Sequence, residues 1–411
     1  MSSVLAKLPV LILLLPALAA AQSFRVYVGN ISTKSVLLAW GTTVGGENTI
    51  GRKSRSHGKA QVKVGDRTAE SKDGWAEVDG LKPDTEYAYE VVLNDQKIGE
   101  GRVRTYPEKS DRLAFFVIGD FGNGSRRQYR VAEEMWKEFE RKSSTDNPVR
   151  FVLTTGDNIY ADVSVGLYVT RSGDDDSHWE SKFFRPYKDL IARIPFYPSI
   201  GNHDGNSSER RADLDVYLDN FFFPDGKPHR WYSLTFGGLA EFFAMDSSNN
   251  TDQGKRAPVY LKDGEQFDWL QKNLRASKAP WKIPYFHHPP YTAGPNHAPN
   301  LEALRHFVDA FEKAGVKVVF TGHEHNFQYS LQSATGGVRY VVSGAGGELR
   351  GGNVLRKMAE AKIEGWSAQP HFLSVEIYDK TLKITPISYE PMVVRDADGR
   401  PVPMPLEVYI P

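Results

Sequence analysis

Five apolar segments of this chain end in the same way, and this feature constrains the fold more than any other. Each is followed at once by glycine and an aspartate, asparagine or histidine, or by two adjacent histidines. The five motifs are Gly119-Asp120-Phe121-Gly122, Gly156-Asp157-Asn158-Ile159-Tyr160, Gly201-Asn202-His203-Asp204, His287-His288-Pro289-Pro290 and Gly322-His323-Glu324-His325. A single aspartate after glycine is commonly a turn or a helix cap. Five such motifs in one region instead indicate a shared site.

From residue 113 onwards, strand-like runs alternate with amphipathic helical segments, which is typical of a layered α/β domain. Residues 113–118, 149–154 and 283–286 are expected strands, and residues 126–142, 264–277 and 301–314 are expected helices. A helix is also expected over 178–194, although Pro186 interrupts its pattern. In open α/β sheets, ligands bind outside the carboxyl ends of the strands. The five motifs lie at such ends, so we expect one common crevice.

Residues 24–105 have a different texture, with short alternating runs separated by turn residues at intervals typical of an all-β sandwich. The segment Leu81-Lys82-Pro83-Asp84-Thr85-Glu86-Tyr87, together with Trp40 on an earlier strand, resembles the fibronectin type III pattern, in which the tyrosine makes a corner contact. Residues 105–110 form the expected linker. We therefore expect domains at 22–106 and 111–390, followed by a C-terminal tail at 391–411.

The charge balance and the amino terminus limit the classes of function. The chain of 411 residues has 51 Lys and Arg residues against 51 Asp and Glu residues, and it has no cysteine. A net charge of zero gives no sign of a nucleic-acid or membrane-surface binder, and the lack of cysteine excludes a disulfide framework. Residues 1–21 contain an apolar run that ends in three alanines, which is typical of a secretory signal peptide and too short to span a membrane. We expect a secreted or periplasmic protein.

Taken together, the five motifs resemble the calcineurin-like metallophosphoesterases, and within them the purple acid phosphatases. The resemblance spans residues 113–390. The run from Gly322 to Tyr329, followed by Ser-Gly-Ala-Gly at 343–346, is especially similar to the small, mammalian-type branch. The plant-type branch has an alanine, a tyrosine and a glutamate where Asn326, Phe327 and Gln328 stand here. The resemblance implies a four-layer α/β/β/α sandwich, preceded here by the smaller all-β domain.

The resemblance also implies a centre of two metal ions with seven ligands. The first ion would be held by Asp120, Asp157, Tyr160 and His325, and the second by Asn202, His287, His323 and the bridging Asp157. Two carboxylates and a phenolate suit iron(III), whereas a carboxylate, an amide and two imidazoles suit zinc, iron(II) or manganese. Tyr160 discriminates among relatives, because a tyrosinate bound to iron(III) gives a visible colour. Its alternative role is that of a core aromatic residue.

Three further residues are candidates for the catalytic steps. We expect His203 to contact the phosphate oxygens and to protonate the leaving group, with Asp204 orienting its imidazole. The alternative is that His203 only braces its loop. His297 lies ten residues past His287, near the place where relatives have another phosphate-contacting histidine. His288, next to His287 in the sequence, is expected to support a ligand or to face the substrate.

These observations predict an exported acid phosphatase that hydrolyses phosphate monoesters through a hydroxide held by two metal ions. A phosphodiesterase or nucleotide pyrophosphatase with two divalent ions fits the same ligands. A third alternative is an inactive surface-binding protein built on the fibronectin-like domain, although every ligand type is present. The expected partner is a small phosphate ester and not a nucleic acid. The oligomeric state has no signal in the sequence.

Overall fold

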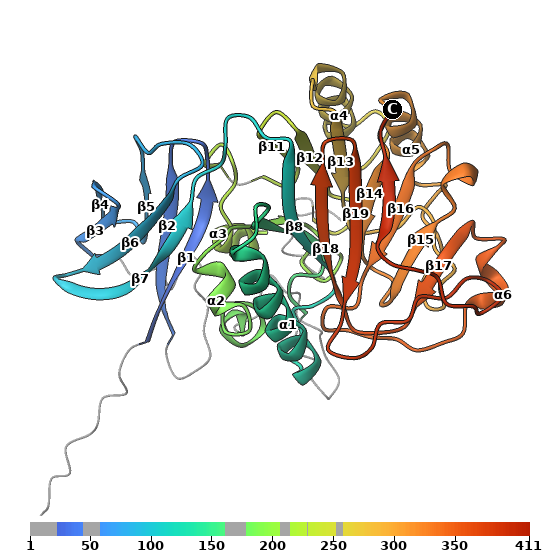
Figure 1. Cartoon of the computed structure of the whole chain (residues 1–411), viewed down its shortest axis with the longest axis horizontal. Coiled ribbons are helices and arrows are strands. Elements are labelled where there is room, and N and C mark those ends of the chain that lie inside the picture. The colour runs from blue at the N-terminus through green and yellow to red at the C-terminus, as the bar shows by residue number, and fades with distance from the viewer. Residues whose placement is uncertain (1–22, 44–57, 161–177, 206–213, 228, 252–257) are drawn as a thin grey trace, which may run out of the picture.

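The computed structural model describes residues 23–43, 58–160, 178–205, 214–227, 229–251 and 258–411. Within these residues the chain forms four β-sheets, two in a small N-terminal domain and two in a larger domain (Figure 1). The expected signal peptide at 1–21 lies outside the described residues. Among the described helices, none is both long and apolar enough to cross a membrane.

In its described residues, 23–43 and 58–104, the N-terminal domain is a fibronectin type III-like sandwich of seven strands. One sheet contains β1 (Ser23–Ile31), β2 (Val36–Thr43) and β5 (Trp75–Val78), and the other has β4 (Arg67–Ser71), β3 (Ala60–Val64), β6 (Glu86–Leu93) and β7 (Gln96–Arg104) in that order. Trp40 is fully buried between the sheets. The hydroxyl of Tyr87 accepts a hydrogen bond of 2.9 Å from the backbone N–H of Lys82. This is the expected tyrosine corner.

Two large sheets form the centre of the second domain. The first has six strands in the order β10 (Phe196–Ser199), β9 (Val149–Thr155), β8 (Arg112–Ile118), β18 (Phe372–Tyr378), β19 (Thr381–Ile387) and β20 (Leu406–Tyr409). The second has seven, in the order β11 (Tyr232–Phe236), β12 (Ala240–Ala244), β13 (Trp281–Tyr285), β14 (Val318–Thr321), β16 (Arg339–Ser343), β15 (Phe327–Ser330) and β17 (Ile363–Ser367). Strands β10, β9 and β8 run parallel, and so do β12, β13, β14 and β16.

Alternation of side chains along the strands explains how the two sheets stack. Phe115 of β8 meets Phe242 of β12 at 5.1 Å between ring centres, so these residues pack between the sheets. The next residue along β12, Phe243, points the other way and meets Trp269 of α4 (Glu265–Ala276). Buried aromatic residues on both faces of each strand require a layer on each side. The second sheet is therefore covered by α4 and by α5 (Arg305–Lys313).

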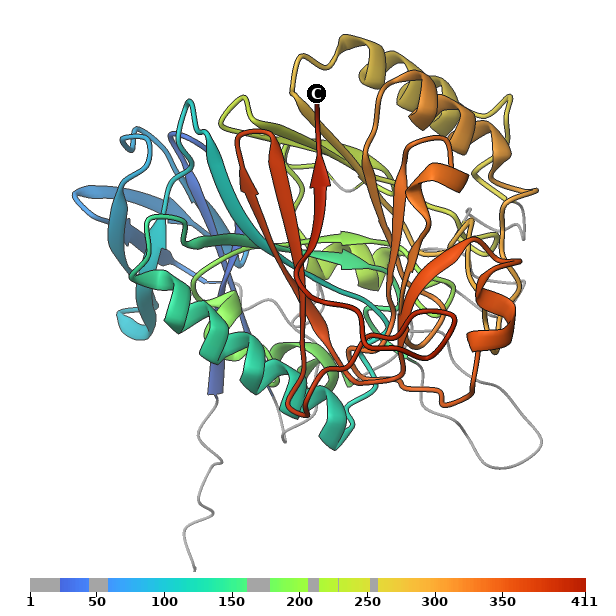
Figure 2. The ribbon, with the colours of Figure 1, turned by 45° about the vertical axis from the view of Figure 1, so that its right-hand side comes forward.

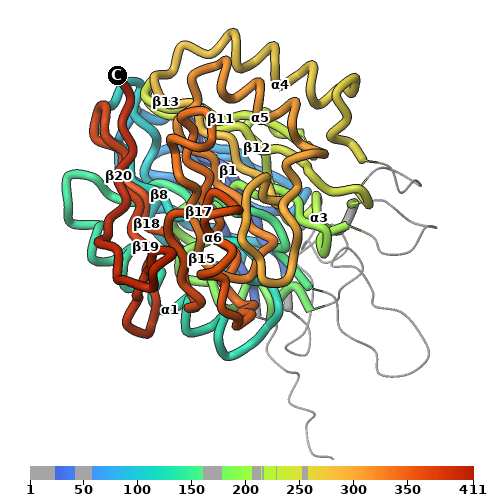
Figure 3. Tube along the Cα trace, turned by 90° about the vertical axis from the view of Figure 1, so that its right-hand side faces the viewer, coloured from blue at the N-terminus to red at the C-terminus, as the bar shows by residue number. Residues whose placement is uncertain are grey.

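The first sheet is covered on its outer face by α1 (Arg126–Ser143), whose buried side includes Val131, Met135 and Phe139. Ser374 of β18 donates a hydrogen bond of 3.3 Å to Glu138 of this helix. Figures 2 and 3 show α1 on one side of the stacked sheets and α4 and α5 on the other. The expected four-layer α/β/β/α sandwich is confirmed.

The remaining helices are short. They are the π-helix Glu180–Phe184, α2 (Lys188–Ile191), α3 (Asp215–Asn220), the 3-10 helix Gln332–Ala334 and α6 (Leu355–Met358). The single helix expected over 178–194 is thus two pieces, with Pro186 between them. Residues 391–411, expected as a tail, also differ from the expectation, because β20 pairs antiparallel with β19 and completes the first sheet.

The N-terminal domain packs against the part of the first sheet that leads to the motifs. The guanidinium of Arg25 on β1 lies 2.6 Å from the buried carboxylate of Glu180. The hydroxyl of Tyr197, on β10, donates a hydrogen bond of 2.8 Å to the Asn30 side chain. Buried apolar residues of both domains form one continuous core. The sandwich therefore backs the strand that precedes Asn202.

Candidate metal centre

Five of the expected ligands lie two or three residues beyond the end of a strand. They are Asp120 after β8, Asp157 after β9, Asn202 after β10, His287 after β13 and His323 after β14. Strands β8, β9 and β10 are parallel, and β13 is parallel to β14. The carboxyl ends of parallel strands meet at one edge of a sheet, and stacking of the two sheets brings the two edges together.

Three of these residues have a backbone conformation that residues other than glycine rarely adopt. The φ angle is 56° at Asp120, 50° at Asp157 and 69° at His323. Left-handed backbone at non-glycine residues costs free energy and persists where the surrounding structure enforces it, often at functional sites. Here it turns each side chain sharply away from the line of its strand.

Glycines in the motifs let the loops touch one another. A Cβ on Gly201 would lie 2.2 Å from the backbone nitrogen of Asp157, and one on Gly322 would lie 2.5 Å from the Asp120 carboxylate. Gly156 has a φ of 88°, and a Cβ there would meet the His287 ring. Contacts this short leave no room for a side chain, so these glycines are a steric condition for the site.

The first cluster joins Asp120, Tyr160 and His325. The Tyr160 hydroxyl lies 3.3 Å from Asp120 Oδ1 and 3.2 Å from His325 Nε2. His325 Nε2 is in turn 3.3 Å from Asp120 Oδ1. A carboxylate oxygen of Asp157 lies within 4.8 Å of ligand atoms from both Asp120 and His325. Four of the expected ligands are thus brought together here.

The second cluster is centred on His287. Its Nε2 atom lies 3.0 Å from Asn202 Oδ1, 3.1 Å from His323 Nδ1 and 3.3 Å from Asp157 Oδ2. Asp157 therefore lies between the two clusters, as a bridging ligand must. The ring nitrogens of His287, His288 and His323 also lie within 4.8 Å of one another.

The hydrogen bonds of His287 test whether a cation fits this cluster. Its Nδ1 atom lies 2.9 Å from the carbonyl oxygen of Thr155. Since a carbonyl can only accept, Nδ1 carries the proton, and once Nε2 is deprotonated it directs a lone pair toward Asn202, His323 and Asp157. Several lone pairs then face one another with few protons to share. A metal ion satisfies this arrangement, and a carbonyl that orients a ligand histidine is a common feature of metal sites.

Burial sets the electrostatics of the centre. Without a cation, burial raises the pKa of Asp120. Burial also penalises the Asp157 carboxylate, but the nearby His287 imidazole outweighs this effect and lowers its pKa below the ordinary range. For His287, burial disfavours the charged ring, yet the carboxylates of Asp157 and Asp120 raise its pKa to about 9. Burial and the same carboxylates hold the pKa of Tyr160 well above its usual value. A bound cation reverses this situation, because it favours the deprotonated ligands.

His203 and Asp204 have different surroundings. His203 is exposed, its ring centre lies 4.5 Å from that of Tyr160, and its backbone N–H donates to Asp157 Oδ1 at 2.8 Å. Asp204 is buried and accepts hydrogen bonds from the backbone of Gly201, the backbone of Ile159 and the side chain of Asn158. These bonds go to the loops that carry Asp157 and Asn202, and the described bonds of Asp204 include none to the His203 ring. Asp204 therefore braces the loops.

Two residues near the centre were given no role from the sequence. Glu324, which separates His323 from His325, accepts hydrogen bonds from the backbone N–H of His297 at 2.8 Å and lies 3.3 Å from its ring Nδ1. This contact holds the His297 ring 3.9 Å from that of His323. Asn158 joins Asp204 to the backbone of Ser199. Both lie inside the motifs, so their position next to ligands was the only available signal.

The histidine beside His287 is held by a serine. Ser247 Oγ lies 2.9 Å from His288 Nδ1, and the His288 ring centre lies 4.4 Å from that of His323. Burial and the neighbouring His287 lower the pKa of His288 to about 3. A neutral ring here faces the second cluster. Asn250, on the same loop as Ser247, donates to the backbone of Asn202 at 2.9 Å.

Comparison with known families agrees with this geometry. The sequence model of the calcineurin-like phosphoesterases matches residues 113–327, which contain all seven expected ligands. The chain belongs to this family. The matched residues run from β8 to the first residue of β15 and include all five strand-end motifs.

Two individual proteins have sequences similar to that of this chain. The chain is 28% identical over 271 residues to purple acid phosphatase 17 of Arabidopsis thaliana, a match that covers 60% of this chain and 72% of the relative. It is 26% identical over 281 residues to an uncharacterized protein of Mycobacterium tuberculosis, covering 64% of this chain and about half of the relative, 51%.

Solved structures share the fold of this phosphoesterase. The structure of PhoD has a TM-score of 0.64 at 15% identity, covering 92% of this chain and 91% of PhoD. Purple acid phosphatase PPD1 from yellow lupin (Lupinus luteus) seeds has a TM-score of 0.60 at 15% identity, covering 93% of this chain and 73% of PPD1. At such identities the likeness concerns the fold alone.

Proposed function

We propose that this protein is an exported purple acid phosphatase that hydrolyses phosphate monoesters with a pair of metal ions. The observation that carries the proposal is the position of Asp157, whose carboxylate lies between a cluster with Asp120 and His325 and a cluster with His287. The likeness to a purple acid phosphatase of Arabidopsis thaliana supports the choice of reaction.

The donor atoms determine which metals suit each cluster. The cluster of Asp120, Tyr160, His325 and Asp157 is rich in anionic oxygen and suits iron(III), whereas that of Asn202, His287, His323 and Asp157 suits zinc, iron(II) or manganese. When bound, two such ions hold a phosphoryl group and lower the pKa of a water nucleophile.

Residues of the chain itself perform the remaining tasks. His203 is exposed beside Tyr160, so its imidazole is accessible to a substrate and can protonate the departing alkoxide. His297, whose ring centre lies 3.9 Å from that of His323, donates a hydrogen bond to a phosphate oxygen from its outer ring nitrogen. Asp204 keeps the loops of Asp157 and Asn202 together and so fixes the spacing of the ligands.

Parallel rate measurements test the reaction. The metal-loaded protein should hydrolyse an aryl phosphate monoester at acidic pH much faster than the matching diester. A preference for the diester would favour the phosphodiesterase alternative. Tyr160→Phe should remove a visible absorption band while the protein retains metal. A wild-type protein that holds two ions and is colourless would contradict the iron(III)–tyrosinate assignment.

Export is part of the proposal and needs its own test. Residues 1–21 have the pattern of a signal peptide. Amino-terminal sequencing of the protein recovered outside the cytoplasm should begin near Gln22. Retention of the full leader on cytoplasmic protein would contradict export and leave the hydrolase proposal intact.

A further inference from the structure

Three buried polar side chains follow the histidine motif at every second position. Glu324, Asn326 and Gln328 are each fully buried, although such residues are mostly exposed in proteins. Of the two residues between them, His325 belongs to the first cluster and Phe327 packs against Tyr329. Buried polar groups are retained where they are hydrogen-bonded. We call these three residues the polar row and ask what they bind.

The far end of the polar row holds a loop between β13 and α5. Gln328 accepts a hydrogen bond from the backbone N–H of Ala293 at 2.8 Å and donates one to the carbonyl of Gly294 at 2.8 Å. Asn326 donates to the same carbonyl at 3.1 Å, and its own oxygen accepts from Gln328 at 2.8 Å. The side-chain amide of Gln328 thus bonds both a backbone N–H and a backbone carbonyl of the loop, and the side chain of Asn326 supports it.

The near end of the polar row holds the segment that carries the candidate phosphate contact. Glu324 Oε2 accepts from the backbone N–H of His297 at 2.8 Å and lies 3.3 Å from Nδ1 of the same ring. The other oxygen, Oε1, lies 3.3 Å from the side-chain nitrogen of Asn296 and 3.4 Å from that of Asn326. The backbone N–H of His297 is therefore hydrogen-bonded to Glu324, and Nδ1 of its ring lies beside the same carboxylate without a hydrogen bond to it.

The loop has no other regular support. Residues 286–304, all of them described, lie between β13 and α5 and contain no helix or strand. Gly294 has a φ of 84°, which marks a sharp turn just before His297. A loop of this kind is positioned by specific hydrogen bonds rather than by a ladder of backbone pairs. The three side chains of the polar row supply such bonds on either side of the turn.

We propose that Glu324, Asn326 and Gln328 position the imidazole of His297 over the metal centre, so that its outer nitrogen meets a phosphate oxygen. The inference rests on the proposed phosphatase function. These are positioning residues, because they act through His297 and touch neither the substrate nor the expected ligand atoms. Nδ1 lies 3.3 Å from Oε2 of Glu324, and we therefore assign Nε2 to the phosphate contact.

A double-mutant cycle tests this role with inorganic phosphate as the probe. The four proteins are the wild type, Glu324→Gln, His297→Ala and the double variant, each as the full metal-loaded chain. Calorimetry gives the phosphate Kd, and elemental analysis gives the metal content. We expect Glu324→Gln to weaken phosphate binding about tenfold, because an anionic acceptor is lost, with two metals retained. In the His297→Ala background the same substitution should change the Kd less than about twofold.

A matched control lies on β15, next to Gln328. Tyr329→Phe removes a hydroxyl from the opposite side of β15 and should leave the phosphate Kd unchanged. If Glu324→Gln does not fold, Gln328→Glu provides the same test, because it removes the donor to Gly294. An unchanged Kd in His297→Ala, or an equal loss on adding Glu324→Gln to it, would overturn the proposal. Failure of the phosphatase function is distinguished by absent monoester turnover in a wild type that still binds phosphate.

Discussion

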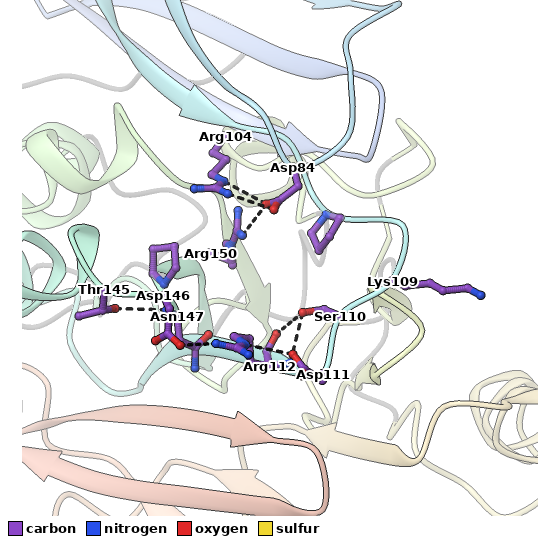
Figure 4. Close-up of a pocket in the computed structure, with 12 residues that line it drawn as sticks. Asp84, Arg104, Lys109, Ser110, Asp111, Arg112, Thr145, Asp146, Asn147 and Arg150 are labelled. Atoms are coloured by element: carbon purple, nitrogen blue, oxygen red, sulfur yellow. Dashed lines mark hydrogen bonds and ion pairs between the residues drawn. The ribbon is translucent and has the colours of Figure 1, made fainter.

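Aspartates gather at two places in this molecule, and the two places treat them differently. At the metal centre, Asp120 and Asp157 are buried and face histidines. At the junction of the two domains, Asp84, Asp111 and Asp146 line a cavity of about 530 Å³. Figure 4 shows the aspartates of the cavity beside arginines. The two places differ in how the charge of each carboxylate is compensated.

In the inter-domain cavity each carboxylate already has a fixed cation. Asp84 receives hydrogen bonds from Arg104 at 2.9 Å and from Arg150 at 2.7 Å. Burial penalises the Asp84 carboxylate, but the two arginines outweigh this effect and lower its pKa. Arg112 pairs with both Asp111 and Asp146, which are 72% and 71% exposed. These charges are neutralised by the protein and by water.

At the metal centre the compensation is incomplete. Among the described ion pairs, those of Asp120 and Asp157 are with histidines and include no lysine or arginine. An isolated buried carboxylate is costly unless it is paired or coordinates a metal. The comparison teaches that the lack of a lysine or arginine partner among the described residues distinguishes the carboxylates of the candidate metal centre from those of the inter-domain cavity.

The largest expected effect comes from breaking the bridge. Asp157→Asn should lower kcat for a phosphate monoester by about a thousandfold or more, since metal catalysis contributes several kcal/mol. Asp146→Asn, in the inter-domain cavity, is the matched control and should leave kcat unchanged. Steady-state rates and metal content of both variants provide the measurement. Substantial turnover by Asp157→Asn would remove the bridging role.

A second prediction concerns the free energy of unfolding. Metal at hundredfold excess over its Kd should stabilise the wild type by about 3 kcal/mol relative to chelated protein. Asp120→Asn should stabilise the chelated protein, because burial disfavours the Asp120 carboxylate. The same variant should weaken the metal-bound protein. Denaturant titrations with and without chelator measure both, and a uniform effect of Asp120→Asn in the two states would contradict the account.

A third prediction follows the pH dependence of stability at the edge of the centre. Burial raises the pKa of Asp246 to about 6 from an ordinary value of 3.8. The folded state therefore holds this proton more tightly, so its stabilising contribution is present below pH 3.8 and is lost as pH rises toward 6. The full loss is at most about 3 kcal/mol. Asp246→Asn should remove this part of the slope in chelated protein. If the free energy of unfolding changed with pH identically in the two proteins between pH 4 and 6.5, the contribution of Asp246 would be ruled out.

The smallest effects are expected in the inter-domain cavity. Asp84→Asn should cost about 1 kcal/mol, since Arg150 is mostly buried and loses its carboxylate partner. Asp146→Asn, in an exposed pair, should change stability by less than about 0.5 kcal/mol. Neither variant should change the monoester rate. Thermal or chemical unfolding gives both values. A larger loss of stability in Asp146→Asn than in Asp84→Asn would show that burial does not determine the cost of losing the carboxylate.

The strand-end motifs could be predicted from sequence because their information is local. A buried strand, a glycine and a ligand side chain are contiguous in the chain, and parallel strands then bring such ends to one edge. Asp120, Asp157, His287 and His323 converge in the structure in this way. Their service as metal ligands stays a prediction until metal is measured.

What sequence reasoning missed depends on contacts between distant segments. Asp204 follows His203 directly, which suggested a pair, but its bonds reach Asn158, 46 positions earlier. Glu324 was given no role from the sequence, and its contact with His297 forms only where the loop of that histidine folds back onto it. The last strand was mistaken for a tail because its four residues gain their partner across a long connection. None of these contacts has a local signature.

Metal stoichiometry tests the central claim most directly. Elemental analysis of the purified chain, with its visible spectrum, should give two ions per chain for the wild type. Asp157→Asn should hold fewer ions, and Tyr160→Phe should retain metal while losing the visible band. A fully active wild-type protein with one ion per chain, or with none, would contradict the account.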